Sequence, residues 1–285
     1  MNDSVACLPD GRPEKLAAYL AEKAVAALMD EAHLTPKPGL VDCRGSGSHD
    51  DMDLALLEAS AKSLEPVFAA MALSGWHRLP DSALRRRIGA IGRDGEKTMM
   101  AVTGGINTHR GAIWSLGLLV TAVALHAGSC SAGQAVESAA TLAQLADTAS
   151  PPVFSKGQYA SRRYRVPGAR EEARAGFPHI TQKALPQLGE SRLRGAGEEA
   201  ARVDALLAIM ASLSDTCILS RGGWSALVTV QQGARMVLKA GGIGTAAGKA
   251  AFYGLEENML ALRVSPGGAA DLLAATLFLD GVTIR

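Results

Sequence analysis

The longest apolar run of the chain spans residues 112–127 and reads AIWSLGLLVTAVALHA. Its 16 residues fall short of the ~20 that a helix needs to cross a bilayer. The run also contains Ser115, Thr121 and His126. We therefore predict a buried central helix at this position and no membrane association.

Composition favours helices in the rest of the chain as well. Apolar residues make up 48% of the 285 residues and aromatic residues only 4%. Alanine-rich sequence with few aromatics suits closely packed helices better than a β-sandwich, and no stretch shows the alternation expected of a strand. We predict an all-α protein with one domain over residues 1–285, in which residues 1–12 are flexible.

Caps and prolines predict where the helices begin and end. We expect helices over residues 14–33, 49–73 (interrupted by Pro66), 81–102, 109 onward and 131–147, and others that begin near residues 169, 198, 223, 244 and 267. Residues 150–168 have no helical period and collect four cations: Lys156, Arg162, Arg163 and Arg165. A solvated, mobile loop is the default interpretation of such a charge run, and a lid over a polyanionic substrate is the alternative.

Two prolines flank Lys37 in the stretch 35–53, TPKPGLVDCRGSGSHDDMD. They restrict the backbone on both sides, so Lys37 is expected on a rigid, non-helical turn. A helix starting just beyond this turn would place three polar side chains on one face: His49, Asp50 and Asp53. A fixed cation beside carboxylates suits a metal–phosphate site. Asp51 fits the N3 position of a capping box instead.

Glycine pairs precede or open four predicted helices: Gly104-Gly105, Gly222-Gly223, Gly241-Gly242 and Gly267-Gly268. The exposed N–H groups of a helix N-terminus attract anions, and glycine lets a ligand approach the backbone. Ser265 and Pro266 fit the N-cap and N1 positions of the last helix. Each pair alone is accounted for by turn geometry. Together with nearby polar residues, the pairs predict one pocket for an anion and for Mg²⁺, which binds carboxylates and phosphate oxygens.

The charge balance and the cysteines limit the kinds of partner. A formal net charge of +1 provides no field that would gather nucleic acid. The four cysteines (Cys7, Cys43, Cys130 and Cys217) have neither metal-site spacing nor a disulfide pattern. The N-terminus contains acidic residues and no apolar signal-peptide core. We expect a cytoplasmic protein that binds neither nucleic acid nor membrane.

Six ordered motifs resemble the triphosphoribosyl-dephospho-CoA synthase family. They are TPKPGLVD (35–42), SHDDMD (48–53), GEKTMMAVTGGINTHRGAIW (95–114), GAREEARAGFP (168–178), DTCILSRGG (215–223) and SPGGAADLLA (265–274). The sequences of these motifs resemble the branch of the family that serves malonate decarboxylase more than the citrate lyase branch. Two positions depart from the pattern: Cys217, where Asn is expected, and Glu171, where Gly is expected.

The resemblance implies a defined reaction. The ribose 2′-hydroxyl of 3′-dephospho-CoA attacks C1′ of the ATP ribose and adenine leaves, with inversion at C1′ as the simplest route. The triphosphate-bearing product then passes to an acyl-carrier-protein transferase. Displacement at an anomeric carbon needs a carboxylate base, by analogy with inverting glycosidases, and Mg²⁺ with fixed cations must hold the triphosphate.

These considerations divide the candidate residues by role. We predict as catalytic Asp53, Glu96, His109, Asp215 and Asp271; as metal ligands Asp50, Asp53, Asp215 and Asp271; and as substrate-binding Lys37, His49, Gly104, Gly105, Asn107, Arg110, Arg170, Arg221, Gly222, Ser265, Gly267 and Gly268. Which carboxylate is the base stays open at this point.

Two other functions are compatible with the same residues. A Mg²⁺-dependent N-glycosidase or phosphohydrolase would use the carboxylates to activate water. A non-catalytic helical nucleotide-binding protein is the alternative from a different class, but it would leave the carboxylates and the constrained Lys37 without a role.

Overall fold

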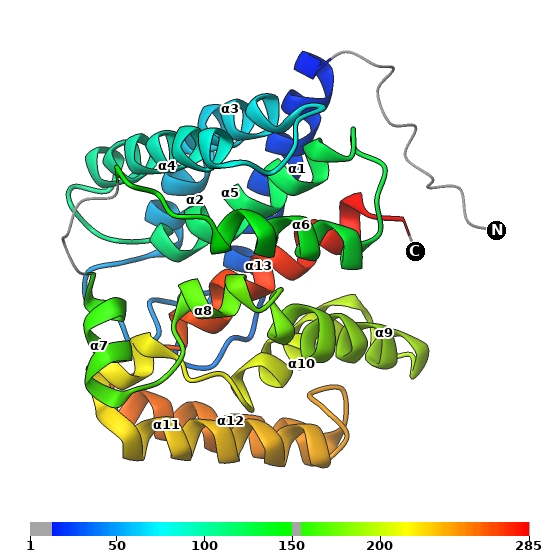
Figure 1. Ribbon diagram of the computed structural model, residues 1–285. Helices are drawn as coiled ribbons and strands as arrows, with labels where there is room; N and C mark the ends of the chain where they lie inside the picture. Colours follow the sequence, from blue (N-terminus) through cyan, green and yellow to red (C-terminus); the bar gives the residue numbers. More distant parts are fainter. Residues whose placement is uncertain (1–12, 150–154, 285) are drawn as a thin grey trace.

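Two apolar helices, α5 (Arg110–Leu125) and α13 (Gly267–Val282), form the centre of the protein (Figure 1). The first is the predicted central helix: its side chains are buried almost continuously from Ala112 to Ala124, because nearly every face is apolar. It packs against α1, α3, α4, α6 and α13, and α13 packs in turn against α1 and α10. The predicted central helix is therefore confirmed, and a second one lies beside it.

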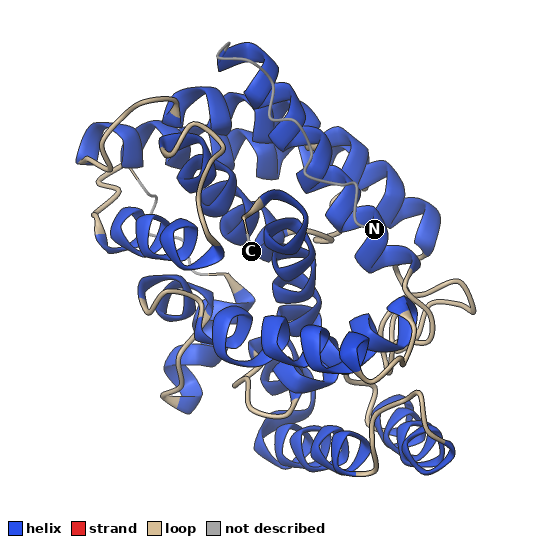
Figure 2. Ribbon diagram, turned by 90° about the vertical axis from the view of Figure 1, so that its right-hand side faces the viewer, coloured by secondary structure: helices blue, strands red, loops and turns tan. Residues whose placement is uncertain are grey.

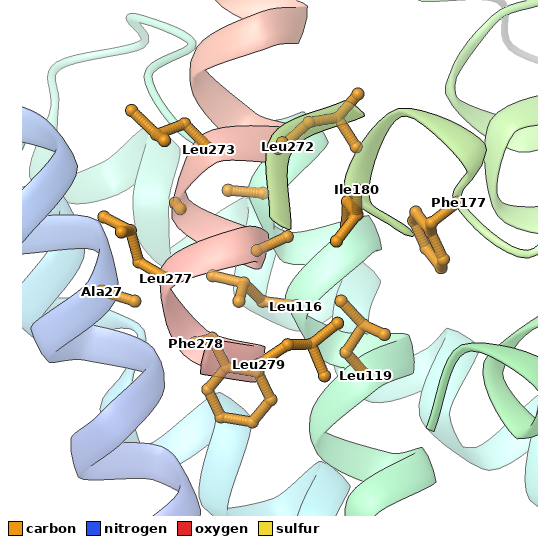
Figure 3. Close-up of a cluster of buried hydrophobic side chains, with 14 of the residues drawn as sticks. Ala27, Leu116, Leu119, Phe177, Ile180, Leu272, Leu273, Leu277, Phe278 and Leu279 are labelled. Carbon is orange, nitrogen blue, oxygen red and sulfur yellow. The ribbon is translucent and has the colours of Figure 1, made fainter. Parts of the chain in front are cut away.

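The core between these helices is aliphatic. Leu116 and Leu119 of α5 lie in the same cluster as Leu277 and Phe278 of α13 (Figure 3). All four are at least nine-tenths buried, and burial of such side chains is the main favourable contribution to folding. The few aromatic residues are thus compatible with a continuous core.

The computed structural model describes residues 13–149 and 155–284. Within these ranges the chain is helical and contains no strand (Figure 2). The remaining elements are α1 (Pro13–His33), α2 (Leu54–Ser63), α3 (Glu65–Gly75), α4 (Ser82–Val102), α6 (Ala132–Gln144), α7 (Lys156–Tyr164), α8 (Ala169–Arg174), the π-helical turn η1 (Ile180–Ala184), α9 (Leu185–Leu193), α10 (Glu198–Met210), α11 (Thr216–Lys239) and α12 (Ala246–Ala261). The predicted all-α class is confirmed. The described residues include no helix with both the length and the apolarity that crossing a membrane requires.

Several helices begin where capping residues in the sequence predict. Asp81 accepts a hydrogen bond from the Leu84 N–H at the start of α4, and Ser131 forms a capping box with Gln134 at the start of α6. Pro66 lies in the first turn of α3 and separates it from α2, as expected. These helix starts can be predicted from the sequence because a cap involves only residues close together in the chain.

The prediction of a loop over residues 150–168 is wrong at residues 156–164. Residues 156–164 form α7, which packs against α11, and residues 150–154 lie outside the described part. Ser155 and Gln158 form a capping box, and Ala160 is buried. One small buried residue and a good cap hold this helix in place, so no apolar stripe marks it.

The predicted helix start near residue 49 is also wrong. Residues 49–53 are not helical, and Asp53 is the N-cap of α2, with its side chain accepting from the Leu56 N–H. The argument that His49, Asp50 and Asp53 share a helix face therefore fails. Capping is the role that the structure gives Asp53, and not Asp51.

The predicted helix start at Gly223 lies inside α11. This helix begins at Thr216, and Gly223 has φ 70° and ψ −165°, which kinks it. A side chain is disfavoured at such a positive φ, so glycine is required at the kink. The kink leaves Arg221 on the short first segment of α11.

Candidate active site

Lys37 is buried and paired within the protein. Its side chain is 1% exposed, and Nζ donates to the backbone oxygen of Glu31 at 2.5 Å and to its Oε1 at 2.6 Å. The backbone N–H of Lys37 donates to Asp42, which fixes the turn. The non-helical turn is as predicted, but the expected free cation for phosphate is a partner of Glu31 in this structure.

Three predicted substrate-binding residues from distant parts of the chain meet at one point. His49 Nε2 lies 2.9 Å from Ser265 Oγ, and Arg221 Nη2 lies 3.1 Å from His49 Nδ1. Because the guanidinium can only donate, Nδ1 accepts and Nε2 carries the proton toward Ser265. Burial first, and then the Arg221 charge, lower the pKa of His49. Ser265 is not the predicted N-cap, since Pro266 occupies that position and the hydroxyl faces His49.

Asp215 caps two helices with one carboxylate. Its Oδ1 accepts from the N–H groups of Cys217, at 2.8 Å, and Ile218, in the first turn of α11. Its Oδ2 accepts from the Ala269 N–H at 3.0 Å, in the first turn of α13. Burial raises the pKa of Asp215, although these backbone donors oppose the shift. The N-termini of α11 and α13 are therefore already satisfied by a protein carboxylate instead of being open to a ligand anion.

Loss of the double cap at Asp215 should destabilise the protein. Asp215→Asn replaces one accepting oxygen by an NH₂ group that faces backbone donors, so we expect the free energy of unfolding to fall by about 1–3 kcal/mol. Urea unfolding followed by circular dichroism measures this loss of unfolding free energy. Asp53→Asn is the matched control, because Asn is as good an N-cap as Asp on a single helix. Equal small effects of the two substitutions would contradict the double cap.

Asp271 belongs to α13, and its side chain lies against the start of α5. It accepts from the Ala112 N–H, and a Cβ built on Gly111 would stand 2.0 Å from its Oδ2, so a side chain there would displace the carboxylate. Burial first, and then the charges of Glu31 and Asp215, raise its pKa well above the usual range. Asp271 is thus a carboxyl with raised proton affinity, held among other acids.

His109 is buried, and the charge of Lys37 acts on it. Its Nδ1 lies 2.8 Å from Ser60 Oγ, whereas Nε2 has no hydrogen-bond partner among the described residues. Burial first, and then the Lys37 charge, lower its pKa to about 4. The imidazole is therefore neutral near pH 7 and carries no charge for phosphate binding.

Asp215 and Asp271 open onto a pocket between α5, α8, α11 and α13. Its walls are Gly111, Trp114, Ser115, Pro167, Gly168, Ala169, Glu172, Phe177, Leu213, Ser214, Asp215, Thr216, Gly268, Asp271 and Leu272. One wall is the segment after α7, where the Trp114 indole donates to the Ala169 oxygen at 3.1 Å. Predicted residues from the 215–223 and 265–274 motifs thus meet in one concave site, with Glu172 as an additional acid.

Two of the predicted glycine pairs serve the geometry of helix ends and helix packing. Gly104 and Gly105 have φ +63° and +93° and close the end of α4, with open space where a Cβ would stand. Gly222 has Val264 and Ala226 where a Cβ would be, so it serves helix packing. By contrast, Gly267 and Gly268 lie against Cys217 and Asp215, beside the pocket.

Glu96, Arg110 and Asn107 form a separate group at the α4–α5 connection. Arg110 Nε donates to Glu96 Oε2 at 3.0 Å, and Asn107 Oδ1 accepts from the Arg110 N–H. Glu96, predicted as catalytic, is thus paired with Arg110, predicted as substrate-binding. Glu96 and Arg170 line a second pocket.

The four predicted metal ligands do not come together. Asp50 is exposed and pairs with Arg263, and Asp53 caps α2. Nowhere in the described ranges do three or more His, Cys, Asp or Glu side chains form a group that could hold a metal ion. The predicted grouping failed because it required a helix from residue 49. Asp215 and Asp271 remain as neighbours.

A model of the ATP:dephospho-CoA triphosphoribosyl transferase family matches residues 17–284. The chain belongs to this family. It is 60% identical over 269 residues to 2-(5''-triphosphoribosyl)-3'-dephosphocoenzyme-A synthase of Klebsiella pneumoniae, covering 94% of this chain and 96% of that protein. It is also 54% identical over 284 residues to a probable 2-(5''-triphosphoribosyl)-3'-dephosphocoenzyme-A synthase of Azotobacter vinelandii, covering 98% and 96% of the two chains. No solved structure matches it.

In this member of the triphosphoribosyl transferase family, several residues at or near the two pockets are not predicted from the sequence. They include Glu31, which pairs with Lys37, and the pocket residues Arg85, Trp114 and Glu172. Glu31 is an acid among the buried positions of α1, and Arg85 lies on the buried side of α4 beside Leu84 and Ile88. A charged residue on the apolar face of a predicted helix is the signal that could have found these two.

Proposed function

We propose that the protein transfers the triphosphoribosyl group of ATP to the ribose 2′-hydroxyl of 3′-dephospho-CoA and releases adenine. The membership of the ATP:dephospho-CoA triphosphoribosyl transferase family supports this reaction. So does the pocket that contains Asp215 and Asp271, with His49, Arg221 and Ser265 at the same helix starts. The named product of the relatives corresponds to this transfer.

The position of the Asp271 carboxyl, which lines the pocket beside Asp215 and accepts from the Ala112 N–H, is the observation that carries the proposal. A base must take the proton of the 2′-hydroxyl as its oxygen bonds to C1′, and a carboxylate with raised proton affinity is suited to that task. The electron pair of the C1′–N9 bond leaves with adenine, which takes up one proton. Asp215 has both oxygens engaged by backbone donors, so we assign it a positioning role.

We also propose that a magnesium ion binds beside these acids together with the substrate phosphates. Mg²⁺ typically uses one or two carboxylates together with phosphate oxygens and waters. Asp271 and Asp215 provide two crowded carboxylates whose repulsion a cation would relieve. When bound, the ion would neutralise the triphosphate and hold it in place while C1′ reacts.

The remaining roles follow from the same reaction. We assign Arg221 and His49 to the phosphates or ribose of a substrate, since both lie at the kinked start of α11. We further propose that the protein acts in the cytoplasm, where ATP and coenzyme A precursors are available. The product would pass to an acyl-carrier-protein transferase. The sequences of the motifs favour the malonate decarboxylase branch of the family.

A product assay tests the proposed reaction. Incubation with ATP, Mg²⁺ and 3′-dephospho-CoA is expected to release one adenine for each triphosphoribosyl conjugate, as measured by chromatography and mass spectrometry. Omission of 3′-dephospho-CoA is the control. Adenine released at the same rate without that acceptor would identify a hydrolase and contradict the proposal.

A further inference from the structure

A second pocket lies on the other side of Trp114, between α4, α5 and α8. Three arginines line it, Arg85, Arg93 and Arg170, together with the acids Asp147 and Glu96. Trp114 lines both pockets, so the two sites share one side chain of α5. Of the three arginines, only Arg170 is among the substrate-binding residues predicted from the sequence, and the proposed function gives none of them a role.

Arg85 is a buried guanidinium with too few partners. The residue is 7% exposed, and its Nε has no hydrogen-bond partner among the described residues. Its nearest acid is Asp147, with Nη1 3.6 Å from Oδ2, and its guanidinium lies 5.2 Å from the centre of the Trp114 ring. Burying a charged group without hydrogen bonds is costly. An anion in the pocket would supply the acceptors that Arg85 lacks.

Both acids of this pocket have a closer cationic partner than Arg85. Asp147 Oδ2 accepts from Arg93 Nη1 at 2.6 Å, and Glu96 pairs with Arg110, which does not line the pocket. Arg170 is exposed and also lines the pocket. The mutual repulsion of the arginines adds to burial in lowering the pKa of Arg85. Three arginines and two acids line the pocket, and one of the acids, Glu96, is paired with Arg110 outside it, which leaves an excess of positive charge at the cavity.

Small residues keep this cavity open. Gly89 and Gly92, one turn apart on α4, both line it. A Cβ on Gly89 would stand 2.1 Å from Asp147 Oδ2 and 2.8 Å from Arg85 Nη1. Glycine at this position therefore lets the acid and the guanidinium reach the same cavity.

We propose that this pocket is a subsite for the phosphate chain of one of the two nucleotide substrates, with Arg85 as its central donor. Arginine suits this ligand because its planar fork binds phosphate oxygens through two parallel hydrogen bonds. The inference rests on the proposed function for the identity of the ligand: the triphosphate of ATP or the diphosphate of 3′-dephospho-CoA. Trp114 then separates the phosphate subsite from the carboxylates that act on the ribose.

Calorimetric titration with inorganic tripolyphosphate tests the subsite directly. Arg85→Met keeps an unbranched apolar stem and leaves Asp147 paired with Arg93. We expect its dissociation constant for tripolyphosphate to rise about tenfold or more. Arg86→Met is the matched control, because Arg86 is the exposed neighbour on the same helix and does not line the pocket. It removes the same charge and should change the constant less than about twofold.

Steady-state kinetics identify the source of the phosphate. If the KM for ATP rises in Arg85→Met while the KM for 3′-dephospho-CoA does not, the subsite holds the triphosphate, and the opposite pattern assigns it to the diphosphate. Arg170→Met, at an exposed position, should shift the same KM in the same direction. A fall in kcat with both KM values unchanged would overturn the subsite.

Further outcomes separate this inference from the proposed function. Equal tripolyphosphate binding by wild type and Arg85→Met, with normal product formation, would overturn the subsite and leave the reaction standing. Arg85-dependent binding without any product would support the subsite and reject the reaction. A loss of unfolding free energy in Arg85→Met with unchanged binding would make Arg85 a structural partner of Asp147 and overturn the proposal.

Discussion

Asp271→Asn is expected to abolish adenine release while leaving the fold at least as stable as wild type. A positioned general base contributes about 10²- to 10⁴-fold to rate, and an amide cannot take the proton of the 2′-hydroxyl. The side-chain oxygen of Asn can still accept from the Ala112 N–H. The substitution also removes a carboxyl that burial, Glu31 and Asp215 make unfavourable to ionise.

The stability gain should depend on pH in a defined direction. The folded-state pKa of Asp271 lies above its unfolded value, so folding binds this proton more tightly. Its contribution to stability is fully present below the unfolded pKa and is lost as pH rises through the folded pKa. The advantage of Asp271→Asn over wild type should therefore grow from about pH 4 upward.

Two measurements decide this prediction. Adenine release at saturating ATP and Mg²⁺ reports the catalytic effect, and urea unfolding without nucleotide at several pH values reports stability. Gly111→Ala is a useful companion, because it displaces the Asp271 carboxylate without removing it. Near-normal turnover by Asp271→Asn, or a stability difference that shrinks as pH rises, would refute the role given to this residue.

Lys37→Met is expected to be the most destabilising substitution in the loop before α2. It leaves the Glu31 carboxylate buried without its cation, and breaking a buried ion pair from one side costs about 3–5 kcal/mol. The uncompensated Glu31 charge would also lie near Asp271. Glu31→Gln should be costly as well, because it leaves the ammonium of Lys37 buried.

A double-mutant cycle separates the pair from a phosphate clamp. Glu31→Gln combined with Lys37→Met removes both charges, and the loss of unfolding free energy should be smaller than the sum of the two single losses. Chemical unfolding of the four proteins provides the coupling energy. If Lys37→Met unfolds like wild type but raises the KM for ATP, Lys37 is a substrate cation and the pair with Glu31 is not its main role.

Much of the architecture was predictable because its signals are local. The apolar run of α5 and the caps Asp81 and Ser131 each lie within a few residues of what they determine. The helix α7 has one buried residue and was missed, since its position depends on α11.

The candidate site was predictable in its residue types more than in its geometry. His49, Arg221 and Ser265 were expected in one pocket and do lie together. The partners of Lys37 and Asp53 could not be read from spacing. The pairing with Glu31 is determined by how the loop folds back onto α1, and the cap of α2 by where that loop ends. Tertiary packing decides these pairings, and a single sequence does not show it.

The shared cap at Asp215 couples two segments that are distant in sequence. Displacement of the first turn of α11 relative to α13 would break hydrogen bonds at both helix starts at once, so the two starts form a single mechanical unit. That unit carries Arg221 on one side of Asp215 and Asp271 on the other. The proposed substrate residue Arg221 and the proposed base Asp271 are thereby tied to each other through one shared carboxylate.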